Sequence, residues 1–463
     1  MTEKLWDTSP QKFEELFDRY SDYPKGIIIK IATMIWGVRF SPSLLKTEQM
    51  KKTNTARYFI FSFDMEKTDD MDEELGKIPT YFRLKNIDNH RFGPVVQVRP
   101  KNNSPYFFEL INGKMMLCEQ FPDDKEPKAI VEIEFDQKPD FNDKTDSKGE
   151  PFTNNASLIF WGEQLYCCLL RACQYWQGDL QCKFCDLNSI VINLRKQGIN
   201  MPATKTPEIL VEAIKAAQEE KDSHLQIIFL SGGAVTDKIQ GMDGLEWYMR
   251  FPEAIKENFG RRYATHLQTV ALPYEKCVRL FEAGVDIHEA NIEVWEPHLF
   301  KWICPGKEKY VGRDEWIKRV IKSVDAFGIG NVVPVFVQGV EMAQPYGFKE
   351  VDAAVESTLN AWDYLMSYGV TPRFDIWALE AGSSLWESQQ DFYPPPIEYF
   401  LKTTRGAYDL LRKHHLPVAR GYVGGSGGYG VHMFGQTAQW DFDEGVRYMK
   451  GCSSGDEKGD EQE

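Results

Sequence analysis

Five of the nine cysteines in this 463-residue chain lie in one short stretch, LYCCLLRACQYWQGDLQCKFCDLN, between Cys167 and Cys185. The other four are scattered, at Cys118, Cys277, Cys304 and Cys452. In a reducing compartment, an odd count with such crowding indicates metal or redox chemistry more than a disulfide framework. The chemistry of the chain is therefore expected to centre on this stretch.

Three of these cysteines have a spacing that suits an iron–sulfur cluster. Cys182 and Cys185 are separated by two residues, and Cys173 precedes them with eight residues between. Thiolates are the usual ligands of such clusters, and short loops bring them to one cluster face. Three ligands on a four-iron cluster would leave one iron open to bind a substrate or cofactor. Using Cys167 or Cys168 in place of Cys173 would lengthen the first gap further.

The stretch resembles the radical S-adenosylmethionine (SAM) superfamily, whose usual pattern is C-x3-C-x2-C after the first strand, with an aromatic residue before the third cysteine. Phe184 fills that position, where the family packs it against the adenine. The pattern here is wider, C-x8-C-x2-C. The resemblance implies a [4Fe–4S] cluster on Cys173, Cys182 and Cys185, since LLRAC ends an apolar strand as the family's first cysteine does. It also implies that SAM binds at the open iron.

The second predicted strand runs into Ser231, Gly232 and Gly233, which resemble the family's Gly-Gly-Glu motif. In the family the backbone of this motif accepts the methionine amino group, and glycine lets the main chain approach the ligand closely. Ala234 stands where the family has glutamate, which leaves that contact to carbonyl groups. An ordinary turn between strand and helix is the alternative interpretation.

The segment HEANIEVWEP is similar to the Asn-Leu-Asp segment of the biotin-synthase-like branch, whose polar residues hydrogen-bond the ribose hydroxyls. By that comparison Asn291 and Glu293 face the barrel interior, since alternate residues share one side of a strand. A charge in an apolar strand needs a partner or a ligand. The alternative is therefore a salt bridge from Glu293 to Arg313 or Arg319; in the family an arginine here often meets the methionine carboxylate, and either residue could serve.

Two later segments occupy the places of further family sites. VPVFVQGVEM is similar to a Gly-x-x-Glu segment near the adenine, which gives that role to Gly339 and Glu341, although one residue separates them here. DIWALEAGSSLW stands where the family closes on the adenine or substrate, and Trp377 within it is a candidate to line the cavity or to pack in the core. His432 is a candidate substrate contact, with a structural role as the alternative.

These motifs follow apolar strands that alternate with amphipathic helices. The predicted strands cover residues 165–170, 226–230, 264–271, 286–294, 332–337 and 374–379, and helices at 206–220, 313–327 and 349–368 fit between them. Such alternation predicts an α/β fold with a parallel sheet, a partial or full (β/α) barrel of the radical SAM type. The active site of a barrel lies at the C-terminal ends of its strands.

The rest of the chain suggests further units. Residues 1–136 are predicted to form a smaller β-rich domain, from runs such as GIIIKIATMIW, VVQVRP, PYFFELI and AIVEIEFD. A polar linker is expected at 137–155, and the barrel at 156–395. A C-terminal helix with a glycine-rich extension should cover 396–450, and an acidic disordered tail 451–463.

Composition limits the partners. The formal net charge of −15 leaves no domain-wide basic surface, which argues against nucleic acid as a partner. No stretch reaches the about 18 apolar residues of a membrane span, and the N-terminus is polar and acidic rather than a signal peptide. A cytoplasmic location without membrane contact is therefore expected.

The resemblance implies an oxygen-sensitive enzyme that reductively cleaves SAM and uses the resulting radical on a small-molecule or peptide substrate. Electrons would come from an external donor of flavodoxin or ferredoxin type, because the sequence holds no second cysteine cluster. One rival is a zinc-stabilised binding or scaffold protein without turnover, although zinc normally takes four ligands. Another is a different barrel enzyme with spare cysteines.

Overall fold

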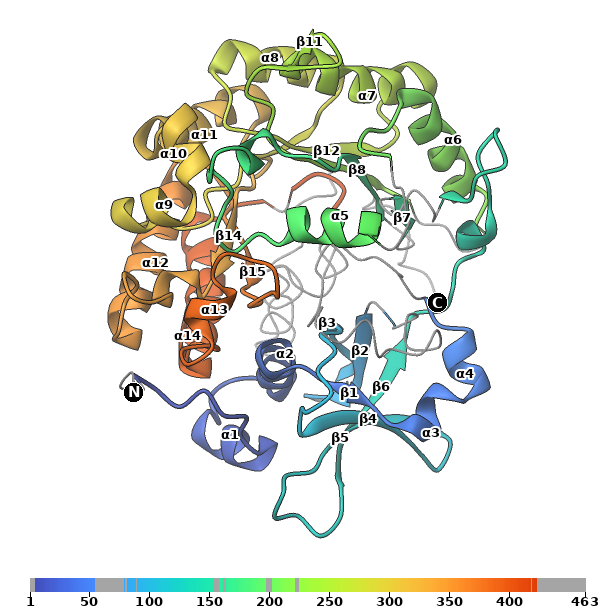
Figure 1. Cartoon of the computed structure of the whole chain (residues 1–463), viewed down its shortest axis with the longest axis vertical. Helices are drawn as coiled ribbons and strands as arrows, with labels where there is room; N and C mark the ends of the chain where they lie inside the picture. The colour runs from blue at the N-terminus through green and yellow to red at the C-terminus, as the bar shows by residue number, and fades with distance from the viewer. Residues whose placement is uncertain are drawn as a thin grey trace, which may run out of the picture.

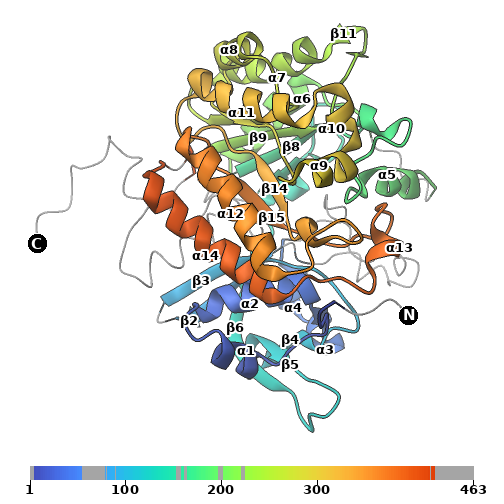
Figure 2. The same ribbon diagram turned by 90° about the vertical axis from the view of Figure 1, so that its left-hand side faces the viewer.

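The computed structural model describes residues 5–54, 79, 81–88, 90–152, 158–160, 164–196, 202–220, 225–417 and 419–422. A curved half-barrel of parallel strands lies above a second, mainly antiparallel sheet that the N-terminal region builds (Figure 1). In the side view, helices α12 (Val351–Ser367) and α14 (Ile397–His414) run from the half-barrel toward that sheet (Figure 2).

In the described part of the chain, six parallel strands form the half-barrel in their order along the sequence. They are β8 (Gln164–Leu170), β9 (Ile227–Gly232), β12 (Ala264–Gln268), β13 (Ile287–Glu289), β14 (Val335–Gln338) and β15 (Arg373–Ile376). Bridges between His288 and Val332 and between Glu293 and Phe336 join the first four strands to the last two. β7 (Leu158–Phe160) pairs antiparallel with β8 at the edge. The prediction of a (β/α) barrel is confirmed in its partial form, and each predicted strand has its counterpart.

Helices follow the strands and cover the outer face of the half-barrel (Figure 1). They are α6 (Pro207–Gln218), α7 (Gly244–Phe259), α8 (Tyr274–Ala283), α9 (Pro297–Ile303), α10 (Pro305–Tyr310) and α11 (Arg313–Phe327), together with α12 and α14. Thr206 begins α6 as its N-cap, because its side chain accepts a hydrogen bond from the Ile209 amide. Short elements complete this half: α5 (Leu187–Lys196), α13 (Trp386–Gln389), β10 (Lys238–Ile239) and β11 (Met242–Asp243). None of the described helices is long and apolar enough to cross a membrane.

The N-terminal sheet has the strand order β1-β4-β5-β6-β2-β3. Its strands are β1 (Arg39–Phe40), β2 (Tyr81–Ile87), β3 (His90–Gln97), β4 (Tyr106–Ile111), β5 (Lys114–Glu119) and β6 (Lys128–Phe135). Among the described strands of this sheet, β1 pairs parallel, with β4, and the others pair antiparallel. The described helices beside the sheet are α1 (Phe13–Arg19), α2 (Lys25–Trp36), α3 (Pro42–Leu45) and α4 (Glu48–Lys51). The region thus combines a sheet with helices.

One predicted strand is wrong: the run GIIIKIATMIW forms helix α2. Every residue of α2 after Lys25 is buried. A helix that is buried on all sides has no polar face, so its apolar residues do not recur every 3.6 positions. The resulting run of β-branched residues has the pattern of a buried strand.

The N-terminal unit and the half-barrel share one apolar core. Ile28 and Ile35 of α2 belong to the same buried cluster as Tyr399 and Phe400 of α14 and Ile376 of β15. Helix α2 therefore fills the space between the N-terminal sheet and the last described helix. The side chains that face the open end of the half-barrel are held in place by this core.

The segment expected to be a linker is anchored by two aromatic residues. Phe141 and Phe152 are buried in the core of the half-barrel and stack with ring centroids 5.4 Å apart. Two isolated aromatic residues in a polar stretch show no helical or strand period, so the sequence pattern predicts a loop there. The glycine-rich extension after residue 422, His432 within it and the predicted acidic tail lie outside the described residues.

Lys30, in the middle of α2, has no exposed surface, and no described group accepts a hydrogen bond from its Nζ. Burial lowers the pKa of Lys30 to about 7, while the charge of Asp375 opposes the shift. The unfolded chain binds this proton more tightly, so the stability of the protein should rise as pH increases from 7 to 10.5. We expect Lys30→Met to raise the free energy of unfolding by about 4 kcal/mol at pH 7 and to lose this gain toward pH 10.5.

Thermal unfolding at pH 7 and pH 10 measures this effect. Lys25→Met is the matched control, since Lys25 is exposed at the start of the same helix. An equal gain for Lys30→Met at both pH values would show that burial of the charge is not its cause.

Candidate functional site

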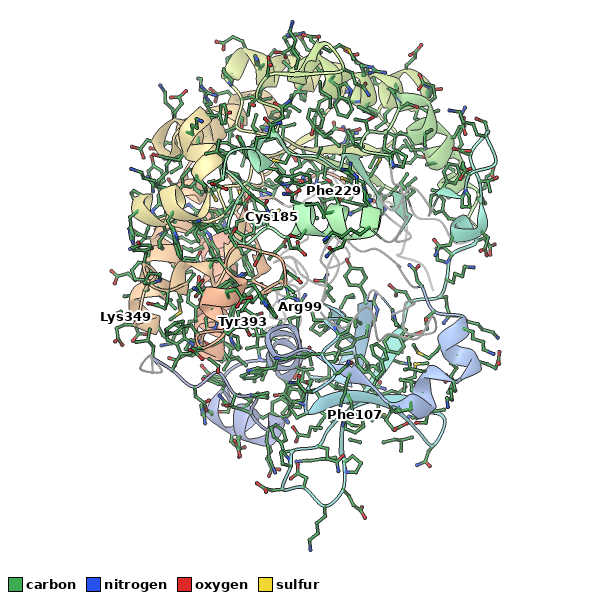
Figure 3. All side chains as sticks on the ribbon, viewed as in Figure 1. Arg99, Phe107, Cys185, Phe229, Lys349 and Tyr393 are labelled. Carbon is green, nitrogen blue, oxygen red and sulfur yellow. The ribbon has the colours of Figure 1, made fainter. Side chains whose placement is uncertain are left out.

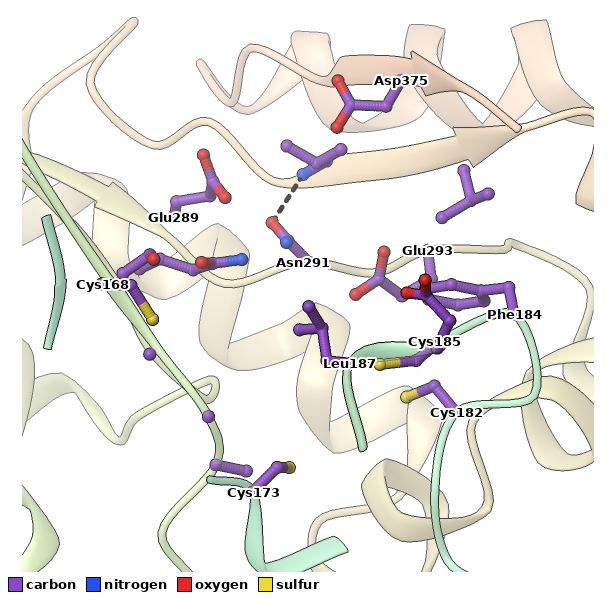
Figure 4. Close-up of a pocket in the computed structure, with 18 of the residues that line it drawn as sticks. Cys168, Cys173, Cys182, Phe184, Cys185, Leu187, Glu289, Asn291, Glu293 and Asp375 are labelled. Carbon is purple, nitrogen blue, oxygen red and sulfur yellow. Dashed lines mark hydrogen bonds between the residues drawn. The ribbon is translucent and has the colours of Figure 1, made fainter. Parts of the chain in front are cut away.

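The described residues enclose a cavity of about 380 Å³ at the C-terminal ends of the half-barrel strands. Each of the six strands contributes to its wall, as do the loop before α5 and the N-terminal sheet. Figure 4 shows Cys173, Cys182 and Cys185 at one end of the pocket and Asp375 of β15 at the other. A ligand pocket is expected at this edge of a barrel sheet.

The three cysteines predicted as ligands all line this pocket and are all partly exposed. Cys173 follows β8, where a short 3₁₀ turn begins, and the Gln174 amide donates to the Ala234 carbonyl after β9. Cys182 and Cys185 share a tight turn, in which the Cys185 amide donates to the Cys182 carbonyl at 3.0 Å. The chain thus holds the three thiols on the connection between β8 and α5, at one end of the pocket.

The alternative first ligands lie differently. Cys167 is fully buried in the core outside the sheet, and it does not line the pocket. Cys168 points the other way, as alternation along a strand requires, and it does line the pocket. Its thiol, however, lies within the strand and faces the Leu170 carbonyl at 3.6 Å. The structure therefore leaves Cys168 as the single rival to Cys173.

A buried cation adjoins the thiols. Lys307 of α10 contacts Glu293 Oε1 at 2.7 Å and donates to the Asn291 carbonyl at 2.6 Å. Burial acts to lower the pKa of Lys307, but Glu293 and the nearby thiols outweigh it and keep the amine charged. A hydrogen bond from Cys304 lowers the pKa of Cys182, and the charge of Lys307 acts in the same direction. The thiolate, which is the form that binds metal, is favoured at Cys182.

The salt bridge considered for Glu293 is therefore present with a different partner. Lys307 takes the place of the two arginines suggested from the sequence, neither of which lines the pocket. Arg313 lies over the Trp295 ring and donates to the Trp295 carbonyl. Arg319 pairs with Glu315 one turn away on α11. These contacts hold both arginines on the outer side of the half-barrel.

Asn291 and Glu293 do line the pocket, although regular strand pairing ends at Glu289. Asn291 Oδ1 accepts a hydrogen bond from the Val335 amide, which Figure 4 shows as a dashed line. Glu293 has a positive φ of 70°, an uncommon conformation that directs its carboxylate toward Lys307. Phe184 also lines the pocket and packs against the core.

The loop after β9 approaches the cysteine loop very closely. Ser231, Gly232 and Gly233 all line the pocket. A Cβ atom on Gly233 would lie 1.9 Å from the Ala172 carbonyl oxygen and 2.7 Å from the Cys173 Cα. The glycine is therefore required by its contact with the segment that carries Cys173, which is a stronger reason than turn geometry alone.

The structure does not bring Gly339 and Glu341 to the pocket. Glu341 is buried and accepts hydrogen bonds from the Gly339 amide and the Tyr399 hydroxyl. Gly339 has a φ of 106° and packs against Phe400. The pair joins the end of β14 to α14, so its contacts are structural.

Glu341→Gln should distinguish a structural role of Glu341 from a role in binding SAM. Burial raises the pKa of Glu341 to about 7, so the folded protein holds this proton more tightly than the unfolded chain. Wild-type stability should then fall as pH rises from 4.5 to 7. We expect Glu341→Gln to raise the free energy of unfolding by about 3 kcal/mol at pH 8, with no gain at pH 4.5, and to leave SAM binding unchanged. Weaker SAM binding in this variant would show that Glu341 contributes to the SAM site, contrary to its position in the structure.

Several pocket residues escape sequence reasoning. Lys307 lies in a polar helix whose sequence carries no family motif. Tyr81, Gln97 and Arg99 come from the N-terminal sheet, and only the three-dimensional arrangement brings them to the barrel. One signal was available: an amide and an arginine alternate in the apolar run VVQVRP, and polar residues in a buried strand need partners or a ligand.

Similar proteins were found among curated sequences and solved structures, whereas no protein-family model matches the chain. The chain is 22% identical over 252 residues to the bacteriochlorophyllide c C-7(1)-hydroxylase of Chlorobaculum limnaeum, a match that covers 52% of this chain and 58% of that protein. The chain thus spans little more than half the length of this relative. This match agrees with the ordered cysteine and glycine segments around one half-barrel pocket. The resemblance of the chain to the radical SAM superfamily is thus confirmed.

Three solved structures are similar to part of the chain. Methylornithine synthase (PylB) matches with a TM-score of 0.37 and 12% identity, covering 58% of this chain and 71% of that one. HydG, a maturase of the [FeFe]-hydrogenase, gives 0.36 and 13%, covering 59% and 56%. Coproporphyrinogen III oxidase (HemN) from Escherichia coli, a radical SAM enzyme, gives 0.32 and 10%, covering 59% and 57%.

The pocket has features that fit a cluster with SAM. Four partly exposed thiols line it, and three of them, Cys173, Cys182 and Cys185, lie on the connection between β8 and α5. The backbone after β9 is kept free of side-chain atoms by Gly232 and Gly233. Thiolates are the usual ligands of iron–sulfur clusters, so this donor set fits such a group.

Proposed function

We propose that Cys173, Cys182 and Cys185 hold a [4Fe–4S] cluster, and that the chain uses it to cleave SAM reductively and modify a small-molecule or peptide substrate. The observation that supports this most is that all three thiols line one pocket, at the strand ends where barrel enzymes work. When bound, the cluster supplies the electron that breaks a carbon–sulfur bond of SAM. The protein positions the reactants and excludes water.

The residues of the pocket have distinct roles in this proposal. Lys307 places a buried positive charge beside Cys182 and Cys304, which offsets the negative charge of the thiolates. Glu293 neutralises the far side of the same lysine. The carbonyls after β9 are left to accept the methionine amino group, and Asn291 and Phe184 are the proposed neighbours of the ribose and the adenine.

The electron is proposed to come from an external donor of flavodoxin or ferredoxin type. Among the described cysteines outside the pocket, Cys118, Cys167 and Cys277 are single buried thiols, and burial raises the pKa of each. Scattered single thiols do not supply the set of ligands that a second cluster would need. Cytoplasmic location is proposed on the same grounds, since thiols of this kind persist in a reducing compartment.

Anaerobic purification and reconstitution test the proposal. We expect a brown protein with about four irons and four sulfides per chain. With dithionite it should convert SAM to products that identify the bond cleaved: 5′-deoxyadenosine with methionine, or methylthioadenosine. A colourless protein with about one zinc and no SAM cleavage would refute it in favour of a zinc-stabilised scaffold.

A further inference from the structure

Gln97, at the end of β3, brings a buried amide from the N-terminal sheet to the barrel pocket. Its neighbours Val96 and Val98 point into the shared core, so alternation directs Gln97 to the opposite face, beside its cross-strand partner Tyr81. Gln97 is 1% exposed and lines the pocket. Among the described residues, neither its Oε1 nor its Nε2 has a hydrogen-bond partner.

Trp377, just after β15, adds a second unpartnered polar atom to the same pocket. The residue is 2% exposed, and no described group accepts a hydrogen bond from its Nε1. Its position is fixed: the Trp377 amide donates to the Gln338 carbonyl, and its ring packs edge-on against Tyr393 at 5.3 Å. The described residues supply no acceptor for this N–H, so it is available to donate to a ligand that enters the pocket.

Arg99 links the N-terminal unit to the half-barrel by hydrogen bonds. Its guanidinium donates to the Met34 carbonyl of α2 at 2.8 Å and to the Trp377 and Ile376 carbonyls at 3.2 and 2.5 Å. Figure 3 shows Arg99 at the junction of the two halves, close to Tyr393 and between Phe107 of the N-terminal sheet and Cys185 of the barrel. These three carbonyl contacts hold the guanidinium in place and connect α2 to β15, while its Nε has no hydrogen-bond partner among the described residues.

We propose that Gln97 and Trp377 form a substrate subsite that recognises a neutral planar amide, such as a lactam or carboxamide, on a small molecule with an apolar body. The assignment to substrate rests on the proposed function, in which SAM occupies the cysteine end of the pocket. Gln97 offers one donor and one acceptor side by side, and an amide edge presents the complementary pair. Trp377 supplies a further donor to a carbonyl oxygen.

The charge around these atoms favours a neutral group over a carboxylate. Asp375 and Glu380 flank Trp377 in sequence and also line the pocket, so a second anion would meet repulsion there. The body of the ligand would contact largely apolar side chains, including Leu187, Ile190 and Val191. Two buried polar residues without hydrogen-bond partners lower the stability of the protein. Such a cost is expected at a site where a bound ligand supplies the missing hydrogen bonds.

Benzamide and benzoate are suitable probes, since they share an aromatic body and differ in the group to be recognised. Their affinities can be measured by NMR titration of the anaerobic, cluster-containing full chain with SAM present. We expect benzamide to bind and benzoate to bind at least about tenfold more weakly. Gln97→Leu and Trp377→Phe should each weaken benzamide about tenfold, whereas the exposed Gln49→Leu should not.

Stability and SAM binding separate the possible outcomes. Gln97→Leu should unfold at the same or a higher temperature than wild type, because it removes an unpaired buried amide, and should keep its iron and its affinity for SAM. Equal binding of both probes, or no binding of benzamide, would overturn the subsite while leaving SAM cleavage as evidence for the proposed function. Loss of SAM affinity in Gln97→Leu would also overturn it, since the amide would then serve SAM. Benzamide selectivity in a protein that cleaves no SAM would support the subsite and refute the proposed function.

Discussion

Replacing Cys182 with alanine is expected to remove the iron–sulfur cluster and abolish SAM cleavage. Two of the three proposed ligand thiols would remain, and the thiolate favoured by Cys304 and Lys307 would be the one lost. The loss should exceed the about 10- to 100-fold effect typical of removing an outer-shell contact to a metal site. Iron and sulfide content, the visible absorption of the cluster and the yield of SAM cleavage products measure it.

Cys168→Ala is the matched control for this experiment. It removes a thiol from the same pocket but from a strand rather than a loop, so iron content and SAM cleavage should remain. Cys173→Ala and Cys185→Ala should behave like Cys182→Ala. If Cys168→Ala loses iron while Cys173→Ala retains it, Cys168 is the first ligand and the proposed set must change.

Gly233→Ala is expected to have an effect nearly as large without touching any thiol. The added Cβ would overlap the Ala172 carbonyl oxygen, so the segment carrying Cys173 must move. Backbone atoms cannot rotate away as a side chain does, and overpacking of this kind lowers the free energy of unfolding by about 1–3 kcal/mol. Because the displaced segment carries a proposed ligand, iron content and SAM cleavage should fall together. Circular dichroism reports whether the variant is folded.

Gly241→Asn provides the comparison for Gly233→Ala. A side chain at residue 241 meets nothing within 4 Å, and asparagine tolerates its φ of 81°. This variant should keep wild-type iron content and SAM cleavage. Wild-type behaviour of Gly233→Ala would mean that the contact between the two loops is not needed to position Cys173.

The half-barrel was predictable because its signals are local. Each strand is a short apolar run followed by a turn and an amphipathic helix, and the period of the pattern changes where the structure does. Cys173 and Ser231 were likewise predicted from their positions at strand ends, where parallel strands bring side chains to one edge.

The errors arise where burial or pairing is decided by distant parts of the chain. The sequence of helix α2 predicts a strand because the helix is buried on all sides and has no polar face. Lys307 was missed as the partner of Glu293 because a lysine in a polar helix carries no signal of its own. Gly339 and Glu341 were assigned to the cofactor from a motif whose spacing did not match, and their partners on α14 could not be read from the sequence.

The contacts of the N-terminal sheet with the barrel could not be predicted at all. Gln97 and Arg99 reach the pocket only because α2 packs on α14, some 370 residues later in the chain. A pairing of that sequence separation leaves no periodic trace in either segment. The amide of Gln97 is visible in the sequence only as a polar residue in an apolar run.

The core shared by α2 and α14 also determines when the protein can finish folding. During synthesis the isoleucines of α2 emerge long before Tyr399 and Phe400. The apolar surface of α2 therefore stays exposed to water while the barrel is synthesised. Contacts of such wide separation form slowly. The pocket is complete only after α14 has docked, so a chain that ends before α14 lacks the support for the wall that carries Gln97 and Arg99.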